Sequence, residues 1–180
     1  MTRLERFVNT EVLSRRLSEE QRAVLSLINN EQLELFVEES NDIENEPTKY
    51  NHYTATLDLV ISRHVDIRIL ETFGQKFSHQ CKLREAPNMN VRVGTYLPPM
   101  GGPHVKTLLL EHLEGDRHNL SSKETYERHH RFESLHPFMD GNGRIGRALY
   151  LREEIWRERL GVLHYGFLHW WYYQSLANGR

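Results

Sequence analysis

Residues 136–147 read HPFMDGNGRIGR, and this stretch joins a glycine-rich turn to the start of a predicted helix. Glycine permits a positive φ and a close backbone approach, so consecutive N–H groups can face one concavity. The N-terminus of the following helix adds about half a positive charge at the same place. The sequence therefore predicts an anion-binding nest formed by Gly141, Asn142 and Gly143.

Charged side chains flank this nest. Arg144 and Arg147 are three residues apart at the start of the predicted helix, so they share one face. Guanidinium groups suit bidentate contact with phosphate oxygens. Asp140 precedes the nest, where bound phosphate would repel a carboxylate unless a hard cation such as Mg²⁺ lay between them. These residues predict a site for a nucleotide's phosphates and a magnesium ion.

A histidine lies at the other edge of the stretch. A histidine with the ordinary pKa of about 6.5 can accept a proton from an attacking hydroxyl near neutral pH, and His136 is placed for that role. Taken alone, Gly-Asn-Gly is usually a turn, a helical arginine pair is usually solvated, and a histidine before proline usually ends a helix. Their occurrence together favours phosphoryl-type chemistry, which needs a phosphate cradle, a cationic clamp, a metal and a base.

Most of the remaining sequence has the periodicity of amphipathic helices. Capping-box patterns begin two of them, at residues 18–21 and 121–124. Asn29-Asn30 is expected to break the first of these patterns into two helices. Apolar spacing predicts one long helix within residues 51–80, which Gly74 would bend or end. It predicts another over residues 144–160, which Gly161 would end. The fold class is therefore predicted to be all-α.

One segment departs from the helical pattern. Residues 91–93 alternate apolar and polar side chains, Gly94 supplies a turn, and residues 98–102 read PPMGG. The pattern predicts a small β-hairpin followed by an irregular loop. We expect residues 1–50 to form N-terminal helices that pack with a catalytic core over residues 51–180 as a single compact unit.

Composition excludes several function classes. The chain of 180 residues is 38% hydrophobic and 27% charged, which is typical of soluble globular domains. A net charge of −2 gives no general attraction to nucleic acid or anionic lipid, and no segment approaches the roughly 20 apolar residues of a membrane span. One cysteine, Cys81, cannot form an internal disulfide, which favours the cytoplasm; we expect a small buried hydrophobe there.

The stretch at 136–147 resembles, at every fixed position, the signature of the Fic family, H-P-F-x-[D/E]-G-N-G-R-x-x-R. The resemblance extends more loosely over residues 34–160, as a helical core with a hairpin ahead of the signature. Most members of this family transfer AMP from Mg²⁺-ATP to Tyr, Thr or Ser hydroxyls of proteins. The resemblance therefore implies ATP as donor, Mg²⁺ as cofactor and a protein as substrate.

The resemblance also implies a role for each signature residue. His136 would deprotonate the target hydroxyl, and Asp140 would bind Mg²⁺ between the α- and β-phosphates. The nest at residues 141–143 would cradle the phosphates, with the Asn142 side chain at the α-phosphate. Phe138 would anchor the loop in the core.

The arginines complete this assignment. Arg144 would hold the β-phosphate, and Arg147 would hold the γ-phosphate. When His136 takes the proton from a hydroxyl attacking the α-phosphorus, pyrophosphate leaves and AMP is transferred. A related branch of the family transfers phosphate instead, but that branch has lysine where this chain has Gly143-Arg144.

A second stretch resembles the family's inhibitory motif, [S/T]-x-x-x-E-[G/N]. Ser40 opens it, and Glu44 and Asn45 close it, ahead of the catalytic core. Paired with Arg147, the Glu44 carboxylate would remove the partner of the γ-phosphate. The simpler interpretation is an acidic, solvated helix end.

Residues 82–97 occupy the place of the family's flap, a hairpin that aligns a substrate segment as an added strand. Val91 and Val93 would present their backbone edges to the target protein. Where the family often has Gly-x-aromatic-Arg, residues 81–84 read CKLR. An ordinary surface hairpin is the alternative.

Two other functions stay open. An autoinhibited member of the family could use Glu44 to position a water molecule and remove AMP from a modified protein. A non-catalytic member would be a nucleotide-binding regulatory or toxin-partner module. Self-modification and a homo-oligomer also stay open, while nucleic acid and membrane are not expected as partners. The aromatic stretch at 170–173 predicts a last packing helix that seals a core or a dimer surface.

Overall fold

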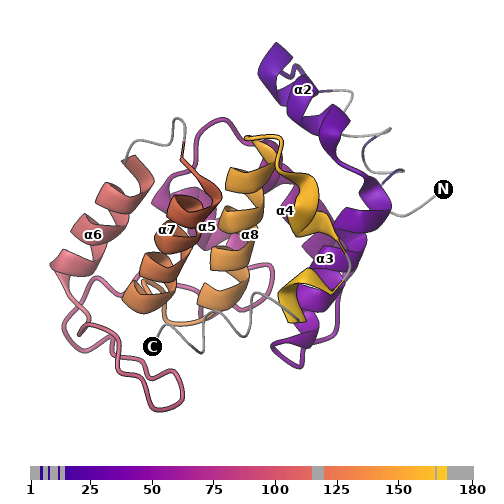
Figure 1. Ribbon diagram of the computed structural model, residues 1–180. Helices are drawn as coiled ribbons and strands as arrows, with labels where there is room; N and C mark the ends of the chain where they lie inside the picture. The colour runs from indigo at the N-terminus through magenta and orange to yellow at the C-terminus, as the bar shows by residue number, and fades with distance from the viewer. Residues whose placement is uncertain are drawn as a thin grey trace. The chain divides into compact units, whose positions relative to one another are not determined.

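A computed structural model describes residues 5, 8, 12, 15–114, 120–164 and 166–169. These residues form seven α-helices, one 3₁₀ helix and no strand, so the all-α prediction is confirmed for them (Figure 1). The elements are α2 (Glu19–Leu27), α3 (Asn30–Asp42), α4 (Tyr50–Ile61), α5 (Ile67–Gly74), α6 (Pro103–Glu114), α7 (Ser122–Leu135), α8 (Asn142–Ile155) and η2 (Leu160–Leu163). The aromatic stretch at 170–173 lies outside the described residues.

The chain divides into two units. One comprises residues 1–63 with residues 151–180, and the other comprises residues 64–150. The predicted division at residue 50 stays a prediction. Among the described helices, none has the length and apolar character needed to cross a membrane.

In the first unit, α3 packs on α4 and on η2, and α2 packs on α4. Ser18 caps α2 with the predicted capping box, and the Asn29 side chain caps α3 by accepting from two backbone N–H groups. Fully buried Leu33 and Leu57 contribute to the core between these helices. The prediction that residues 29 and 30 separate two helices is therefore confirmed.

The prediction of one continuous helix within residues 51–80 is wrong, because two helices, α4 and α5, occupy this segment, but the second ends at Gly74 as expected. The Asp66 carboxylate accepts from the N–H of Ile69 at 2.7 Å and so begins a new helix. Arg152 also caps the end of α4, because its Nη2 donates a hydrogen bond to Ser62 O at 2.7 Å. Both features depend on side chains that apolar periodicity does not register.

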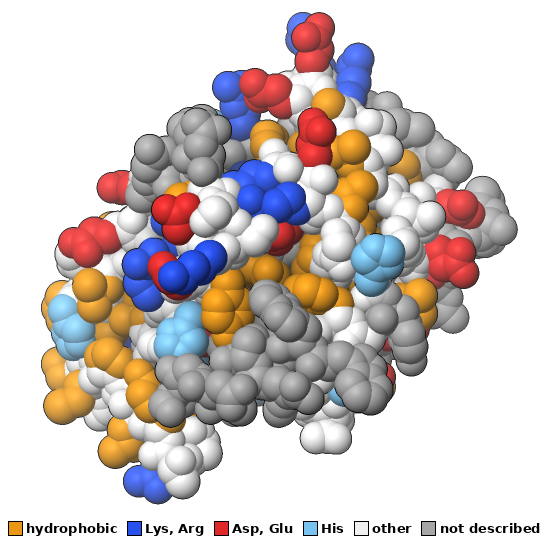
Figure 2. All heavy atoms as spheres, in the orientation of Figure 1, with side chains coloured by type: hydrophobic (Ala, Val, Ile, Leu, Met, Phe, Trp, Pro, Cys, Tyr) orange, Lys and Arg blue, Asp and Glu red, His pale blue; other side chains and the backbone are white. Residues whose placement is uncertain are grey.

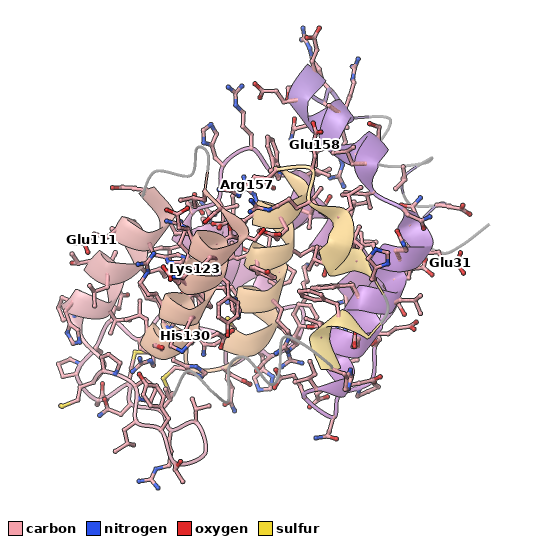
Figure 3. All side chains as sticks on the ribbon, in the orientation of Figure 1. Glu31, Glu111, Lys123, His130, Arg157 and Glu158 are labelled. Carbon is pink, nitrogen blue, oxygen red and sulfur yellow. The ribbon has the colours of Figure 1, made fainter. Side chains whose placement is uncertain are left out.

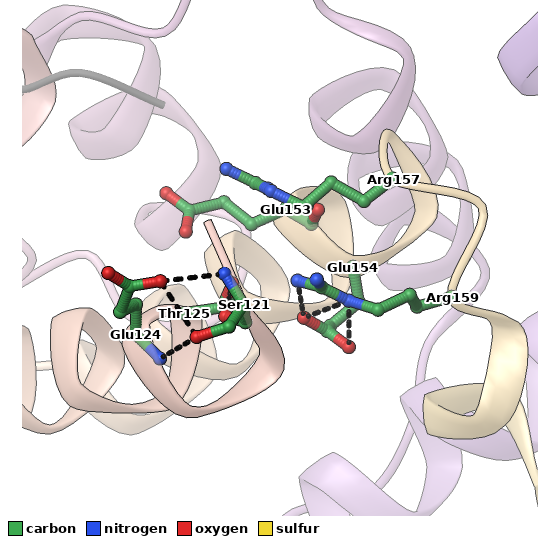
Figure 4. A network of polar contacts seen from close by, with 7 residues as sticks. All are labelled: Ser121, Glu124, Thr125, Glu153, Glu154, Arg157 and Arg159. Carbon is green, nitrogen blue, oxygen red and sulfur yellow. Dashed lines mark hydrogen bonds and ion pairs between the residues drawn. The ribbon is translucent and has the colours of Figure 1, made fainter. Parts of the chain in front are cut away.

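The predicted end of the helix over residues 144–160 is also wrong. Helix α8 ends at Ile155, and Glu158 adopts a left-handed backbone with φ of 56°. The N–H of Arg159 then donates to Glu154 O at 3.0 Å, which is the six-residue closure of a Schellman motif. Arg159 Nε also donates to both carboxylate oxygens of Glu154 at 3.0 Å (Figure 4). Glu158 therefore has the left-handed backbone that ends the helix, a role that was predicted for Gly161.

In the second unit, α6 packs on α7. The predicted capping box of α7 is confirmed: Ser121 N–H donates to Glu124 Oε2 at 2.8 Å, and Glu124 N–H donates to Ser121 Oγ at 3.3 Å (Figure 4). Figure 3 labels Glu111 on α6 and Lys123 on α7, where both side chains are exposed. The facing sides bury Leu109 and Phe132.

The predicted β-hairpin is not shown. Val93 and Tyr96 form an isolated antiparallel bridge around Gly94, whose φ is 58°. Two prolines follow at 98 and 99, and proline has no N–H to continue a ladder. The described segment is therefore a bridged turn without strands.

Candidate active site

The loop between α7 and α8 contains the first half of the signature. His136 ends α7 with a left-handed backbone, φ 48° and ψ 60°, and its N–H donates to Phe132 O at 2.9 Å. This conformation costs a non-glycine residue about 1–2 kcal/mol, so surrounding contacts must impose it. The side chain is half-buried beside the turn.

A distant segment pairs with this loop. Leu83 and Phe138 form an antiparallel bridge. Its two hydrogen bonds run from Arg84 N to Pro137 O and from Met139 N to Lys82 O, each at 2.9 Å. The loop is therefore fixed along its backbone by residues about 55 positions earlier in the chain.

The Arg84 side chain reaches the same loop. It is fully buried, and its Nε and Nη2 donate to His136 O at 2.7 Å and to Leu135 O at 2.8 Å. Burial lowers the pKa of Arg84 below its usual range. Arg84 is not a predicted site residue, although its position matches the arginine in the family's flap-opening pattern.

The predicted nest has the backbone it requires. Gly141 has φ of 79°, and its N–H donates to Asp140 Oδ1 at 2.7 Å. Gly143 is already inside α8, so only the first of the two glycines uses a positive φ. In the part of the chain that the structure describes, the N–H groups of Asn142, Gly143 and Arg144 have no backbone acceptor. Three donors at a helix N-terminus thus remain for an anion.

Tight packing lies beneath the nest. A Cβ on Gly74 would lie 2.2 Å from Cys81 Sγ, and one on Gly141 would lie 3.9 Å from the same sulfur. Cys81 is fully buried, and burial, helped by the nearby Glu71 carboxylate, raises the pKa of its thiol to about 12. The expectation of a small buried hydrophobe is confirmed, and such a thiol is a poor nucleophile.

Asn142 closes the loop. Its Oδ1 accepts from Phe138 N at 2.8 Å, and its Nδ2 donates to Phe138 O at 2.7 Å. The side chain is 1% exposed. These two bonds give the Asn142 side chain a structural role in the loop. Its contact with the α-phosphate stays a prediction.

Both signature arginines are buried at the start of α8. Arg144 is 7% exposed, and its guanidinium carbon lies 5.1 Å from the centroid of the Phe77 ring. Its Nε has no hydrogen-bond partner among the described residues. Arg147, 4% exposed, follows on the same helix. Because buried polar groups are normally bonded, an unsatisfied Nε on a residue in the first turn of α8 fits a site for phosphate oxygens.

Helix α7 supports α8 directly. The His129 Nδ1 lies 3.0 Å from Gly146 O, and a Cβ on Gly146 would lie 2.1 Å from Glu133 Oε1. Burial lowers the pKa of His129 to about 3, and its hydrogen bond to Gly146 opposes this only partly. The imidazole is therefore neutral at physiological pH, and its 3.9 Å approach to Glu133 is not an ion pair.

The stretch that resembles the inhibitory motif lies in the first unit. Ser40 is buried in α3, and Glu44 is exposed directly after this helix. Asn45 has φ of 55°, and Glu46 N–H donates to Asn41 O at 3.1 Å, so α3 ends in a Schellman motif. The left-handed backbone explains why the motif admits glycine or asparagine at that position. Glu44 and Arg147 belong to different units, so their pairing stays a prediction.

The two predicted docking residues, Val91 and Val93, differ in their backbone hydrogen bonds. The Val93 N–H and C=O are both bonded to Tyr96, at 3.0 and 2.9 Å. Val91 makes no backbone hydrogen bond within the described residues. A cavity of about 420 Å³ lies beside the bridged turn, lined by residues that include Tyr96, Leu108, Arg128, Arg131 and Leu135.

Comparison with known protein families identifies the class. The model described as the Fic/DOC family matches residues 56–152, which is more than half of the chain. The chain belongs to the Fic/DOC family. No curated protein matches its sequence. Membership is compatible with transfer of AMP, or a related nucleotidyl group, to proteins.

Proposed function

We propose that this protein transfers AMP from ATP to a hydroxyl group of a protein. The observation that carries the proposal is the buried Arg144, whose Nε lacks a partner among the described residues, at a helix start with three available N–H groups. A cationic, preorganised cradle of this kind suits a polyphosphate.

Binding of the triphosphate would involve the N–H groups of residues 142–144 with the guanidinium groups of Arg144 and Arg147. Asp140, half-buried before the nest, would hold Mg²⁺, which neutralises phosphate charge when bound. Because Asp140 Oδ1 already accepts from Gly141 N–H, its carboxylate is oriented before any ligand arrives.

His136 would act as the base. The target hydroxyl oxygen forms a bond to the α-phosphorus while its proton passes to the imidazole. The bond from the α-phosphorus to the bridging oxygen breaks, and its electron pair leaves with pyrophosphate. Arg144 and Arg147 would stabilise the charge on that leaving group.

The exposed apolar side chains after the bridged turn support a protein substrate. Leu97 is 63% exposed and Met100 is 67% exposed. Figure 2 shows hydrophobic side chains at the surface in the region where α6 and the segment before it lie. We propose that the target docks along residues 91–100, with Val91 offering its backbone to an added strand.

The central experiment incubates wild type and His136→Ala with Mg²⁺, cell lysate and ATP labelled at either the α- or the γ-phosphate. We expect protein-bound label from α-labelled ATP only. Loss of the base should lower this incorporation by about 10²–10⁴-fold. Lys123→Ala, which changes an exposed residue in the first turn of the same helix, should label normally.

Other outcomes would redirect the proposal. Label from γ-labelled ATP would mean phosphate transfer. Release of AMP from a modified protein, without incorporation, would favour the hydrolase. ATP binding with no activity that depends on His136 would favour a regulatory module.

A second experiment tests the proposed autoinhibition by Glu44. Glu44→Gly should raise AMP incorporation by about tenfold, equivalent to about 1.4 kcal/mol, because Arg147 would become available to the γ-phosphate. Glu44→Asp should change it less, and Glu46→Gly, which removes a neighbouring exposed carboxylate, should leave it unchanged. Equal incorporation by wild type and Glu44→Gly at saturating ATP would contradict autoinhibition by Glu44.

A further inference from the structure

We infer that Arg84 is a positioning residue, which holds His136 in its left-handed conformation while other groups bind the nucleotide. The catalytic part of this inference rests on the proposed function. The structural part concerns only the backbone of the loop.

The contacts of Arg84 join three segments of the second unit. Besides its bonds to Leu135 O and His136 O, Nη1 donates to Pro99 O at 2.9 Å and to Met89 O at 3.3 Å. The Arg84 backbone accepts from Gly102 N–H at 2.9 Å. One side chain therefore fixes the end of α7 against the segment that contains the bridged turn.

The chemistry of these contacts favours arginine. All four acceptors are backbone carbonyls, and no carboxylate pairs with Arg84 among the described residues. Two of them lie at the C-terminus of α7, where carbonyls lack helical partners and the helix dipole is negative. A planar guanidinium can reach several such acceptors at fixed angles, whereas an ammonium group lacks that geometry.

The phosphate nest is held by different contacts. Gly141 bonds to Asp140, and Asn142 bonds to Phe138, while the Arg84 side chain donates to neither residue 141 nor any residue of α8. Changing this side chain should therefore disturb the base more than the nucleotide site. That separation distinguishes a positioning role from a general loss of structure.

The test uses the full chain with Arg84→Lys and Arg84→Gln. We expect AMP incorporation at saturating ATP to fall by about 100-fold for Gln and about tenfold for Lys, with each decade equivalent to about 1.4 kcal/mol of barrier. The Kd for Mg²⁺-ATP, measured by calorimetry, should stay within about threefold of wild type. Arg68→Gln, which changes an exposed arginine of α5 outside the proposed site and the docking segment, should alter neither quantity.

Amide hydrogen exchange provides a readout that does not require activity. The N–H of His136, bonded to Phe132 O, should exchange at least about tenfold faster in Arg84→Lys, because its conformation is less constrained. The N–H of Ile145, bonded to Gly141 O, should exchange at the wild-type rate. Since lysine keeps the charge and most of the stem, this variant serves if Arg84→Gln does not fold.

Two results would overturn the inference: unchanged exchange at His136, or ATP affinity and incorporation falling in parallel. Absence of incorporation by wild type would instead contradict the proposed function. The exchange measurement would still decide whether Arg84 holds His136.

Discussion

Two loops of the second unit, residues 136–141 and residues 91–100, are built in opposite ways. The first is held by the Arg84 side chain, the bridge at Phe138 and the two bonds of Asn142. The second has a single bridge of its own and exposes Leu97 and Met100. Phosphate chemistry benefits from donors fixed in advance, whereas a loop that receives a protein partner benefits from an adaptable surface.

The largest expected effect comes from removing the side chain that closes the first loop. Asn142→Ala leaves the buried N–H and C=O of Phe138 without their partners, so the free energy of unfolding should fall by about 3 kcal/mol. Affinity for Mg²⁺-ATP should fall with it. Urea denaturation and calorimetry measure the two quantities. Asn88→Ala, in the exposed segment before the turn, should change neither, and an equal loss there would erase the contrast between the loops.

An intermediate effect is expected from acid, through the contact between α7 and α8. Unfolded His129 takes up a proton below about pH 6.5, whereas folded His129, with its pKa lowered to about 3, does not. Its contribution to stability is therefore complete above pH 6.5 and is lost as the pH falls toward 3. Between pH 7 and pH 5 the loss should be about 2 kcal/mol. In His129→Gln, which keeps a donor for Gly146 O, this part of the pH dependence in urea denaturation should vanish; an unchanged slope would assign it elsewhere.

The smallest effect sharpens the comparison most directly, because Gly141 and Gly94 share a left-handed backbone. Alanine at either position should lower the free energy of unfolding by about 1 kcal/mol through backbone strain, since a new Cβ meets nothing within 4 Å at Gly94 and only ordinary contacts at Gly141. Only Gly141→Ala should also weaken Mg²⁺-ATP binding, by several-fold, because Gly141 shapes the nest. Similar weakening by Gly94→Ala would mean that the turn takes part in nucleotide binding.

Local patterns predicted the parts of the fold that local interactions create. The capping boxes at Ser18 and Ser121 begin their helices as expected, because a side chain and a backbone group three residues apart suffice. The signature likewise predicted a glycine turn directly before a helix N-terminus, since these two features are adjacent in sequence. Binding of an anion there stays a prediction.

Contacts between distant residues were not predictable in this way. The bonds of Arg84 to the end of α7 span about 50 residues, and the stacking of Arg144 on Phe77 spans almost 70. Predictions of two helix boundaries were wrong. Asp66 begins α5 with a side-chain cap, and Glu158 ends α8 by adopting a left-handed backbone. Apolar periodicity contains no information on either kind of contact.

The absence of a side chain at residue 146 has a consequence for how sequences of this kind can vary. The signature leaves this position unrestricted, yet here the Glu133 carboxylate occupies the volume that a methyl group would need. A larger residue at 146 therefore requires the Glu133 carboxylate to move or a shorter residue at 133. Gly146→Ala should lower the free energy of unfolding by itself and should lower it less in combination with Glu133→Ala. Substitutions at the two positions are therefore expected to be correlated.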